Sequence, residues 1–263
     1  MRFNSDQIQK IGKEISSKVD GKTLFDEFSR GRYSTDASVY QIKPLGVVLP
    51  KDTNDVLSLM EYSQKNSVPL LARGGGSSQC GQTVGESVVL DYSKHQNKIL
   101  ELNVEEKYVW VQPGVVLDHL NAYLKPHGLW FPVDVSTSSR ATIGGMSANN
   151  SCGSRSLYYG NMVHNVLAIE AILDDGSIFN FDQINKNYLA TKNNQDRLYK
   201  IIDKFIDVRQ QVGGEIDANW PTTQRRVGGY NIDLIDPEGF NSSNLLVGSE
   251  GTLSLFNKIK LKL

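Results

Sequence analysis

The chain has 263 residues and a formal net charge of −1, with acidic and basic residues mixed along its length. The absence of a basic block or stripe argues against a nucleic acid partner. The two cysteines form no CxxC pair and the four histidines show no metal-ligand spacing, so we expect no metal site. Neither a signal peptide nor an apolar run of about 18 residues is present, so we expect a cytoplasmic protein without a membrane span.

The first predicted element is an amphipathic helix over residues 5–19. Its apolar residues recur at spacings of three and four and are Ile8, Ile11, Ile15 and Val19. The stretch that follows is mixed and turn-rich, up to about residue 43. We therefore treat residues 1–36 as an N-terminal helical extension.

A strand–helix–strand order begins at Leu45. LGVVLP reads as a buried strand, Thr53 is expected to cap a helix that runs to about Lys65, and VPLLA at 68–72 reads as a second strand. VVLD at 88–91 reads as a third strand. Short connections of this kind indicate parallel strands joined by a crossover helix.

After residue 93 the pattern is more antiparallel. We predict strands at ILELN and YVWVQP, followed by a helix with Val116, Leu120 and Leu124 that stops near Gly128. A hairpin through Asp174, Asp175 and Gly176 comes next, and then a helix over 196–212. The last element is a half-buried alternating strand at TLSLFNKIKLKL. The chain ends inside that alternation, so we expect a further domain normally to follow.

Residues 71–83 read LARGGGSSQCGQT, with three glycines directly after an apolar strand. Backbone N–H groups at a glycine-rich turn can converge on one anion, and glycine permits positive φ and close approach. Phosphate is the usual ligand of such a loop. A glycine-rich surface turn without a ligand is the alternative.

Two common phosphate-loop patterns fit incompletely. The Walker A pattern GxxxxGK[ST] is approached by Gly76, Gly81 and Thr83, but Gln82 stands where the lysine belongs. The Rossmann pattern GxGxxG fails because Gln79 takes the place of the third glycine. A nucleotide-binding, NTPase-like protein therefore stays only as an alternative.

RGGGSS at 73–78 resembles a third type, the pyrophosphate loop of the FAD-binding PCMH-type domain of the vanillyl-alcohol oxidase superfamily. Four further segments resemble parts of that domain in the same order, at 33–56, 111–134, 141–162 and 247–254. Their order and spacing are similar to those of FAD-linked oxidases and of D-lactate or D-2-hydroxyglutarate dehydrogenases. The resemblance covers about residues 33–263.

The resemblance implies an α+β fold in two lobes. The first lobe, residues 37–93, is expected to hold a small, mostly parallel sheet with flanking helices. The second lobe, residues 94–263, is expected to hold a larger mixed or antiparallel sheet. FAD would lie between the lobes, and its pyrophosphate would meet the loop at 73–78.

The resemblance also implies cofactor-binding positions. The pyrophosphate is expected on the amides of Gly74, Gly75, Gly76, Ser77 and Ser78, with Arg73 facing either the phosphates or an acidic partner. The adenosine side is expected along Thr142, Ile143, Gly144 and Gly145, with Pro132, Asp134 and Ser138 upstream and Val166 against the adenine. The flavin side is expected near Asn149, Gly153, Tyr159 and Gly160, closed by Glu250 and Gly251. The family's proline after the aspartate is Val135 here.

The implied function is the FAD-binding domain or subunit of a flavin-dependent oxidoreductase, in which a 2-hydroxy acid gives a hydride to flavin N5. No histidine stands in the loop at 73–78, so FAD is expected to be non-covalent. Arg225 or Arg226 could pair with a substrate carboxylate. The catalytic base is unknown and is expected in a C-terminal substrate domain absent from these residues.

Two interpretations follow. The chain is either part of a flavin-dependent enzyme, whose partner chain would carry the substrate domain and an iron–sulfur domain, or a non-catalytic flavin-binding or scaffold module. We expect no turnover of 2-hydroxy acids by this chain alone.

Overall fold

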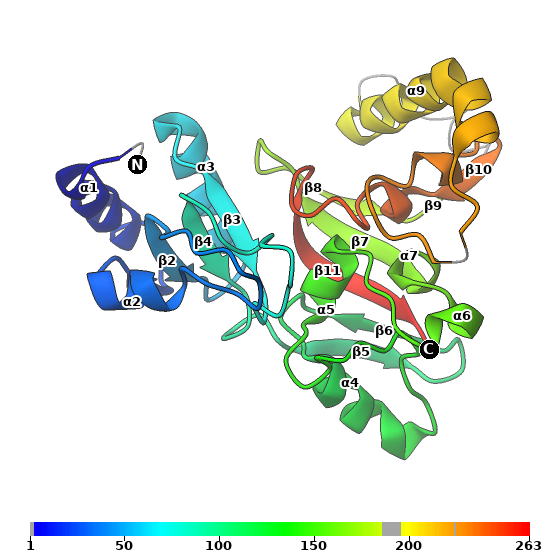
Figure 1. Ribbon diagram of the computed structural model, residues 1–263, viewed down its shortest axis with the longest axis horizontal. Helices are drawn as coiled ribbons and strands as arrows, with labels where there is room; N and C mark the ends of the chain where they lie inside the picture. The colour runs from blue at the N-terminus through cyan, green and yellow to red at the C-terminus, as the bar shows by residue number, and fades with distance from the viewer. Residues whose placement is uncertain (1–2, 186–195, 224) are drawn as a thin grey trace.

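The computed structural model describes residues 3–185, 196–223 and 225–263. Its strands form a four-stranded sheet, a five-stranded sheet and a two-stranded ribbon. Figure 1 shows the four-stranded sheet with the N-terminal helices on one side of the molecule and the five-stranded sheet on the other. The predicted α+β architecture with two lobes is confirmed.

Lobe 1 is built on strands in the order β1-β2-β4-β3, with bounds Lys22–Leu24, Gly46–Leu49, Val88–Asp91 and Leu70–Arg73. Strands β2 and β3 both run parallel to the central β4, which is buried at all four positions. Only β1 is antiparallel. The three predicted strands are therefore confirmed, and the loop at 74–78 leaves the sheet at the carboxyl end of β3.

The helices of lobe 1 are α1 (Ser5–Ser16), α2 (Glu27–Arg32) and α3 (Thr53–Asn66). Ile8, Ile11 and Ile15 of α1 are buried in the same apolar cluster as strands β2 and β4. The buried face of α1 therefore belongs to the core of lobe 1, and β1 extends its sheet. The helix begins as predicted but ends at Ser16, short of the predicted residue 19, so Val19 lies beyond it and is only partly buried.

The N-cap of α3 was predicted wrongly. Asp52 is the cap, because its side chain accepts hydrogen bonds from the backbone N–H groups of Asn54 and Asp55. The hydroxyl of Thr53 instead donates to Oδ1 of Asn257 at 2.8 Å. Both residue types favour N-caps, so the sequence did not separate them.

Lobe 2 is built on an antiparallel sheet in the order β5-β6-β11-β7-β8. The bounds are Ile99–Asn103, Tyr108–Val111, Leu255–Lys262, Val166–Ile172 and Ile178–Phe181. The C-terminal strand β11 was expected to be half-buried. It is the middle strand, paired with β6 on one side and β7 on the other, and Ile259 and Leu261 are fully buried.

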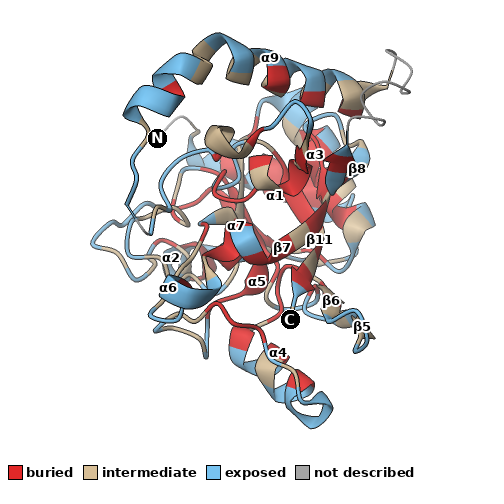
Figure 2. Cartoon of the chain, turned by 90° about the vertical axis from the view of Figure 1, so that its right-hand side faces the viewer, coloured by how far each residue is buried: buried red, intermediate tan, exposed pale blue. Residues whose placement is uncertain are grey.

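Helices and short elements cover this sheet. They are α4 (Leu117–Leu124), a 3₁₀ turn (Lys125–His127), α5 (Ile143–Ala148), α6 (Ser156–Tyr159), α7 (Met162–Asn165), α9 (Arg197–Asn219), the ribbon β9–β10 (Gln183–Asn185 and Gly239–Asn241), and 3₁₀ turns at Ile232–Leu234 and Ser242–Leu245. As predicted, α4 and its 3₁₀ turn end at Gly128, which has φ +70°. Figure 2 shows buried residues gathered in β7 and β11, with the outer face of α9 exposed. Helix α9 runs beyond the predicted end at residue 212, to Asn219.

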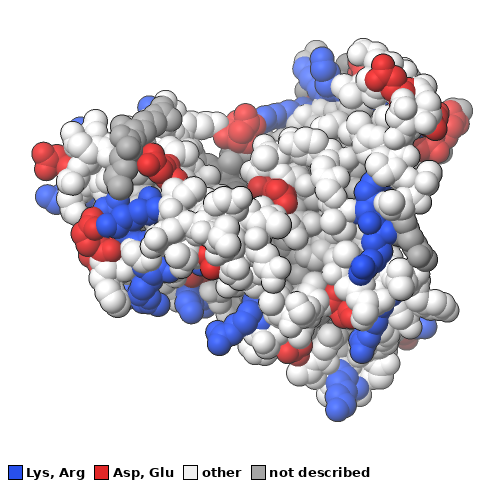
Figure 3. All heavy atoms as spheres, in the orientation of Figure 1, with Lys and Arg blue, Asp and Glu red and all other residues white. Residues whose placement is uncertain are grey.

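Buried residues join the two lobes. Ile172 of β7 and Leu255 of β11 lie in the apolar cluster of lobe 1. The Thr53–Asn257 hydrogen bond crosses the same boundary, so the sheet of lobe 2 rests directly on α3. No helix of the described residues is both long and apolar enough to cross a membrane. Figure 3 shows positive and negative side chains interspersed on one face, with a mostly uncharged centre.

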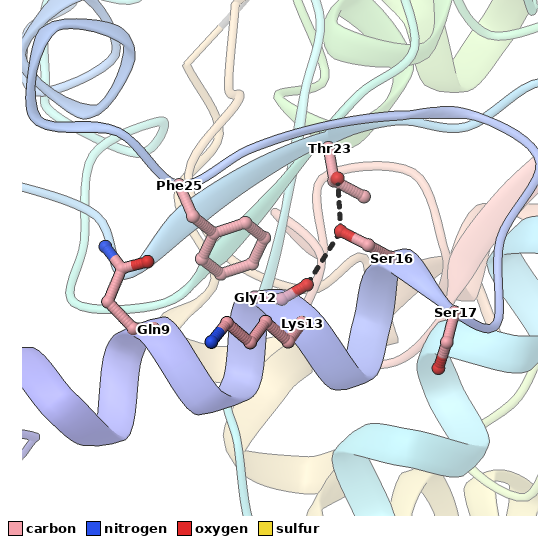
Figure 4. Close-up of a pocket in the computed structure, with 7 residues that line it drawn as sticks. All are labelled: Gln9, Gly12, Lys13, Ser16, Ser17, Thr23 and Phe25. Atoms are coloured by element: carbon pink, nitrogen blue, oxygen red, sulfur yellow. Dashed lines mark hydrogen bonds between the residues drawn. The ribbon is translucent and has the colours of Figure 1, made fainter.

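A surface pocket of about 510 Å³ lies between α1 and the chain around β1 (Figure 4). Two of its hydroxyl groups are already paired, since Oγ of Ser16 donates to the carbonyl of Gly12 and bonds Oγ1 of Thr23. The ring of Phe25 covers Gly12, where a Cβ would lie 2.7 Å from Cγ of the ring. This pocket sits at the N-terminal helix and not at the glycine-rich loop after β3.

Candidate cofactor site

The loop at 74–78 presents unpaired backbone donors. Within the described residues, no N–H group from Gly74 to Ser78 donates a hydrogen bond to the protein. The loop follows the carboxyl end of β3, the position where open α/β sheets bind ligands. Unpaired N–H groups on a nearly bare backbone are the donor set that a phosphate group needs.

The glycines are required by a neighbouring segment as well. A Cβ on Gly74 would overlap Oγ1 of Thr142, and a Cβ on Gly75 would overlap the carbonyl oxygen of Arg140. Gly76 has φ +63°, a left-handed conformation that favours glycine. The loop backbone therefore lies directly against residues 140–142, and this contact between the lobes needs the side chains to be absent.

Arg73 holds the loop in place from the end of β3. Its guanidinium donates to the carbonyls of Tyr33, Thr83 and Thr35 at 3.3, 3.2 and 2.8 Å. Burial lowers the pKa of Arg73, and the nearby charge of Asp91 offsets part of that effect. The hydrogen bonds of Arg73 go to backbone carbonyls while the charge of Asp91 acts on it from nearby, and its predicted place beside the phosphates stays a prediction.

The segment from Thr142 to Gly145 packs against the loop through buried positions. The hydroxyl of Thr142 accepts from the N–H of Gly145 at 3.4 Å and caps α5. The N–H groups of Ile143 and Gly144 donate to the carbonyls of Val115 and Pro113 at 2.8 Å. Since the side chains of Thr142 and Ile143 are buried and the N–H groups of residues 143–145 are already paired, this segment offers a packing surface rather than free hydrogen-bond donors.

Asp134 organises the chain around Gly153. Its carboxylate accepts from the hydroxyl of Ser154 at 2.7 Å and from the N–H of Arg155 at 3.0 Å. Desolvation acts to raise the pKa of Asp134, but these hydrogen bonds outweigh it and leave the pKa below its usual value. A Cβ on Gly153 would overlap Asp134, so the glycine is needed for this contact.

Of the other two predicted positions upstream of α5, Pro132 is buried and the carbonyl of Ser138 accepts from the N–H of Asp118.

Gln82 links three distant segments, and we call Ser78, Gln82, Asn149 and Glu250 the clasp. Nε2 of Gln82 donates to Oδ1 of Asn149 at 3.0 Å and to Oε1 of Glu250 at 2.9 Å, and its Oε1 accepts from the hydroxyl of Ser78. Glu250 and Gly251 both have positive φ, and the N–H of Glu250 donates to the carbonyl of Ala148. Gln82 was noted in the sequence only as a missing lysine, and nothing in its spacing pointed to these partners.

Tyr159 lies in an exposed aromatic group. Its ring stands edge-on to Trp130 at 5.2 Å and to Tyr158 at 4.8 Å between centroids. Gly160 has φ +78°. Val166 differs from expectation, because its side chain is 1% exposed and lies in the core of lobe 2, packed by the protein itself.

The two arginines after α9 have different surroundings. Arg226 pairs with Asp233 at 2.6 Å and stacks over the ring of Trp220. Arg225 donates to the carbonyl of Gly153 at 3.2 Å and is solvent-exposed. Of the two, Arg225 is therefore the one that lies beside a predicted cofactor position.

The fold and the loop together define a two-lobed α+β domain that presents a glycine-rich backbone with unpaired N–H groups between its lobes. The FAD binding domain family matches residues 44–182, just over half of the chain. The chain therefore belongs to the family of FAD binding domains, and FAD is its cofactor.

Similar proteins agree with this family. A D-2-hydroxyglutarate dehydrogenase of Haemophilus influenzae is 35% identical over 243 residues, which cover 88% of this chain and 23% of that protein. The glycolate oxidase subunit GlcD of Bacillus subtilis is 31% identical, covering 97% of this chain and 45% of GlcD. An alkyldihydroxyacetonephosphate synthase structure has a TM-score of 0.67 at 18% identity, over 97% of this chain and 40% of the synthase, and thus shares the fold. The chain spans about a quarter of the length of the dehydrogenases.

Proposed function

We propose that the chain binds FAD with the pyrophosphate on the backbone N–H groups of residues 74–78. The observation that carries the proposal is the set of consecutive donors without a protein partner in the described structure. Gln82 stands where a nucleotide-binding lysine would be, and Arg73 is engaged with carbonyls, so the backbone itself would supply the positive potential. The uncharged loop fits two phosphates held by hydrogen bonds rather than by ion pairs.

We propose that the segment 142–145 lines the adenosine side of FAD and that Asn149, Gly153, Tyr159 and Gly160 line the flavin side. The contact of Gly74 with Thr142 supports the first assignment, because it brings the two glycine-bearing segments together. The clasp supports the second, because it places Asn149 and Glu250 beside the end of the loop.

The activity proposed for the whole protein is oxidation of a 2-hydroxy acid, as the names of the dehydrogenases and of the glycolate oxidase subunit suggest. FAD, when bound, supplies the acceptor for the hydride. This chain's residues bind and orient the cofactor, and exposed Arg225 beside Gly153 is available for a substrate carboxylate. We propose that other substrate-binding groups belong to the part of the relatives that this chain does not span, on a partner chain or a further domain that could include an iron–sulfur domain.

FAD is proposed to be non-covalent, since the loop at 74–78 contains only glycine and serine and lacks a histidine. The cytoplasm is the compartment we propose. The test is reconstitution with FAD, gel filtration and a visible spectrum of the protein peak. A flavin spectrum is expected, and heat denaturation should release all the flavin into the supernatant. A protein peak without flavin would contradict FAD binding, and flavin that stays with the precipitate would contradict the non-covalent bond.

A further inference from the structure

We propose that Gln82 is a positioning residue that holds the pyrophosphate loop closed against lobe 2 and so slows the release of FAD. This inference rests on the proposed function. It starts from one side-chain amide that bonds Ser78 within the loop, Asn149 at the end of α5 and Glu250 in the last turn before β11. Asn149 lies 67 residues and Glu250 lies 168 residues from Gln82 in the sequence.

The chemistry of the clasp fixes the direction of the amide. A carboxylate only accepts hydrogen bonds, so the nitrogen of Gln82 must face Glu250. Oε1 of Gln82 is thereby left to accept from the hydroxyl of Ser78. The side chain of Asn149 turns its oxygen toward Gln82 and accepts the second hydrogen bond from Nε2. A lysine at position 82 could donate to Glu250 but could not accept a hydrogen bond from the hydroxyl of Ser78. Glutamine has both the donor that Glu250 needs and the acceptor that Ser78 uses here.

The clasp matters because the loop has few bonds of its own. Arg73 anchors its beginning, whereas no N–H group of residues 74–78 is paired within the described protein. Gly75, Gln79 and Cys80 are exposed. Thr83 ties the far end of the loop to lobe 1, through Arg73 and Asp36, and Gln82 ties it to lobe 2. Donors that are held in place before a ligand binds lose less conformational entropy on binding, so an opened clasp weakens retention of the pyrophosphate.

The clasp is a surface feature, and its loss should hardly change the stability of the fold. Asn149 and Glu250 are exposed, and hydrogen bonds between exposed groups add little to the free energy of unfolding. A residue that only supported the fold would change the melting temperature of the FAD-free protein. A positioning residue changes the rate of FAD release instead.

The experiment measures FAD release by stopped-flow dilution and thermal melting of the FAD-free protein. Gln82→Ala is expected to release FAD about fivefold faster, equivalent to about 1 kcal/mol, with little change in melting temperature. Gln82→Glu keeps the shape but sets a carboxylate against Glu250, and it should release FAD at least as fast. In a Glu250→Ala background, Gln82→Ala should raise the release rate by a smaller factor than in the wild type, because one of the three hydrogen bonds of Gln82 is already gone.

The matched control is Gln79→Ala, since Gln79 is exposed in the same loop and makes no hydrogen bond among the described residues. It should release FAD at the wild-type rate. If the wild type holds FAD but Gln82→Ala and Gln82→Glu release it as slowly as Gln79→Ala does, this inference is wrong and the proposed function still stands. A wild-type protein that binds no FAD overturns the proposed function and this inference with it.

Discussion

Gly75 and Arg140 touch backbone to backbone, because the carbonyl oxygen of Arg140 fills the position that a Cβ on Gly75 would take. A backbone carbonyl cannot turn away as a flexible side chain can. The two lobes can therefore meet here only if residue 75 has no side chain, and this requirement holds whether or not a ligand is bound.

Gly75→Ala is therefore expected to lower the free energy of unfolding by about 1–3 kcal/mol, the usual cost of overpacking, and to weaken FAD binding. The control is Gly85→Ala, whose Cβ would lie an ordinary 3.6 Å from Cδ2 of Leu71. Urea denaturation of both variants measures the difference. Equal midpoints for Gly75→Ala, Gly85→Ala and the wild type would refute the packing explanation.

The Ser154 hydroxyl should stabilise the protein only when Asp134 is ionised. The pKa of Asp134 is lowered in the folded protein, so its contribution is full above the unfolded value of about 3.9 and is lost as the pH falls through the folded pKa. Ser154→Ala is expected to cost about 1 kcal/mol at neutral pH and almost nothing in strong acid.

Urea midpoints as a function of pH measure this effect, with Ser136→Ala as the control. Ser136 is exposed two residues from Asp134 and makes no hydrogen bond among the described residues. A cost of Ser154→Ala that stays constant down to strong acid would show that the hydroxyl acts independently of the Asp134 charge.

Asp55 should be a main support of lobe 1. Its buried carboxylate accepts from the N–H groups of Asp20, Gly21 and Lys51 at 2.7, 2.9 and 2.7 Å. Asp55→Ala leaves these donors without their acceptor, and we expect a loss of about 3 kcal/mol of unfolding free energy.

Asp55→Asn keeps one acceptor oxygen and should lie between the wild type and Asp55→Ala in a thermal melt. Asp118→Ala, at an exposed position in α4, is the control and should melt close to the wild type. If Asp55→Ala melted with Asp118→Ala, the carboxylate would be dispensable for the fold.

Local patterns predicted much of lobe 1 and the place of the loop. Strands β2, β3 and β4 are short apolar runs bounded by turn residues, and the glycines follow β3 directly. Alternation of apolar residues also predicted β11, but it does not tell a central strand from an edge strand. The central position of β11 depends on its pairing with β6 and β7, far away in the sequence.

The site was less predictable because its contacts are tertiary. The partners of Arg73 are the carbonyls of Tyr33, Thr35 and Thr83, and a carbonyl leaves no mark on composition or spacing. Val166 resembled a cofactor contact in sequence, but the sheet turns it into the core. Gln82 was visible as an unusual residue, while its role needed the turn at Glu250 to be folded back beside it.

The most direct test of the account compares the affinities of FAD, FMN and riboflavin for the same protein by titration calorimetry. If the backbone donors of residues 74–78 hold the pyrophosphate, FAD should bind at least about a hundredfold more tightly than FMN, which has a single phosphate and no adenosine, and riboflavin should bind more weakly than FAD. Equal affinities for FAD, FMN and riboflavin would contradict the assignment of the pyrophosphate to this loop.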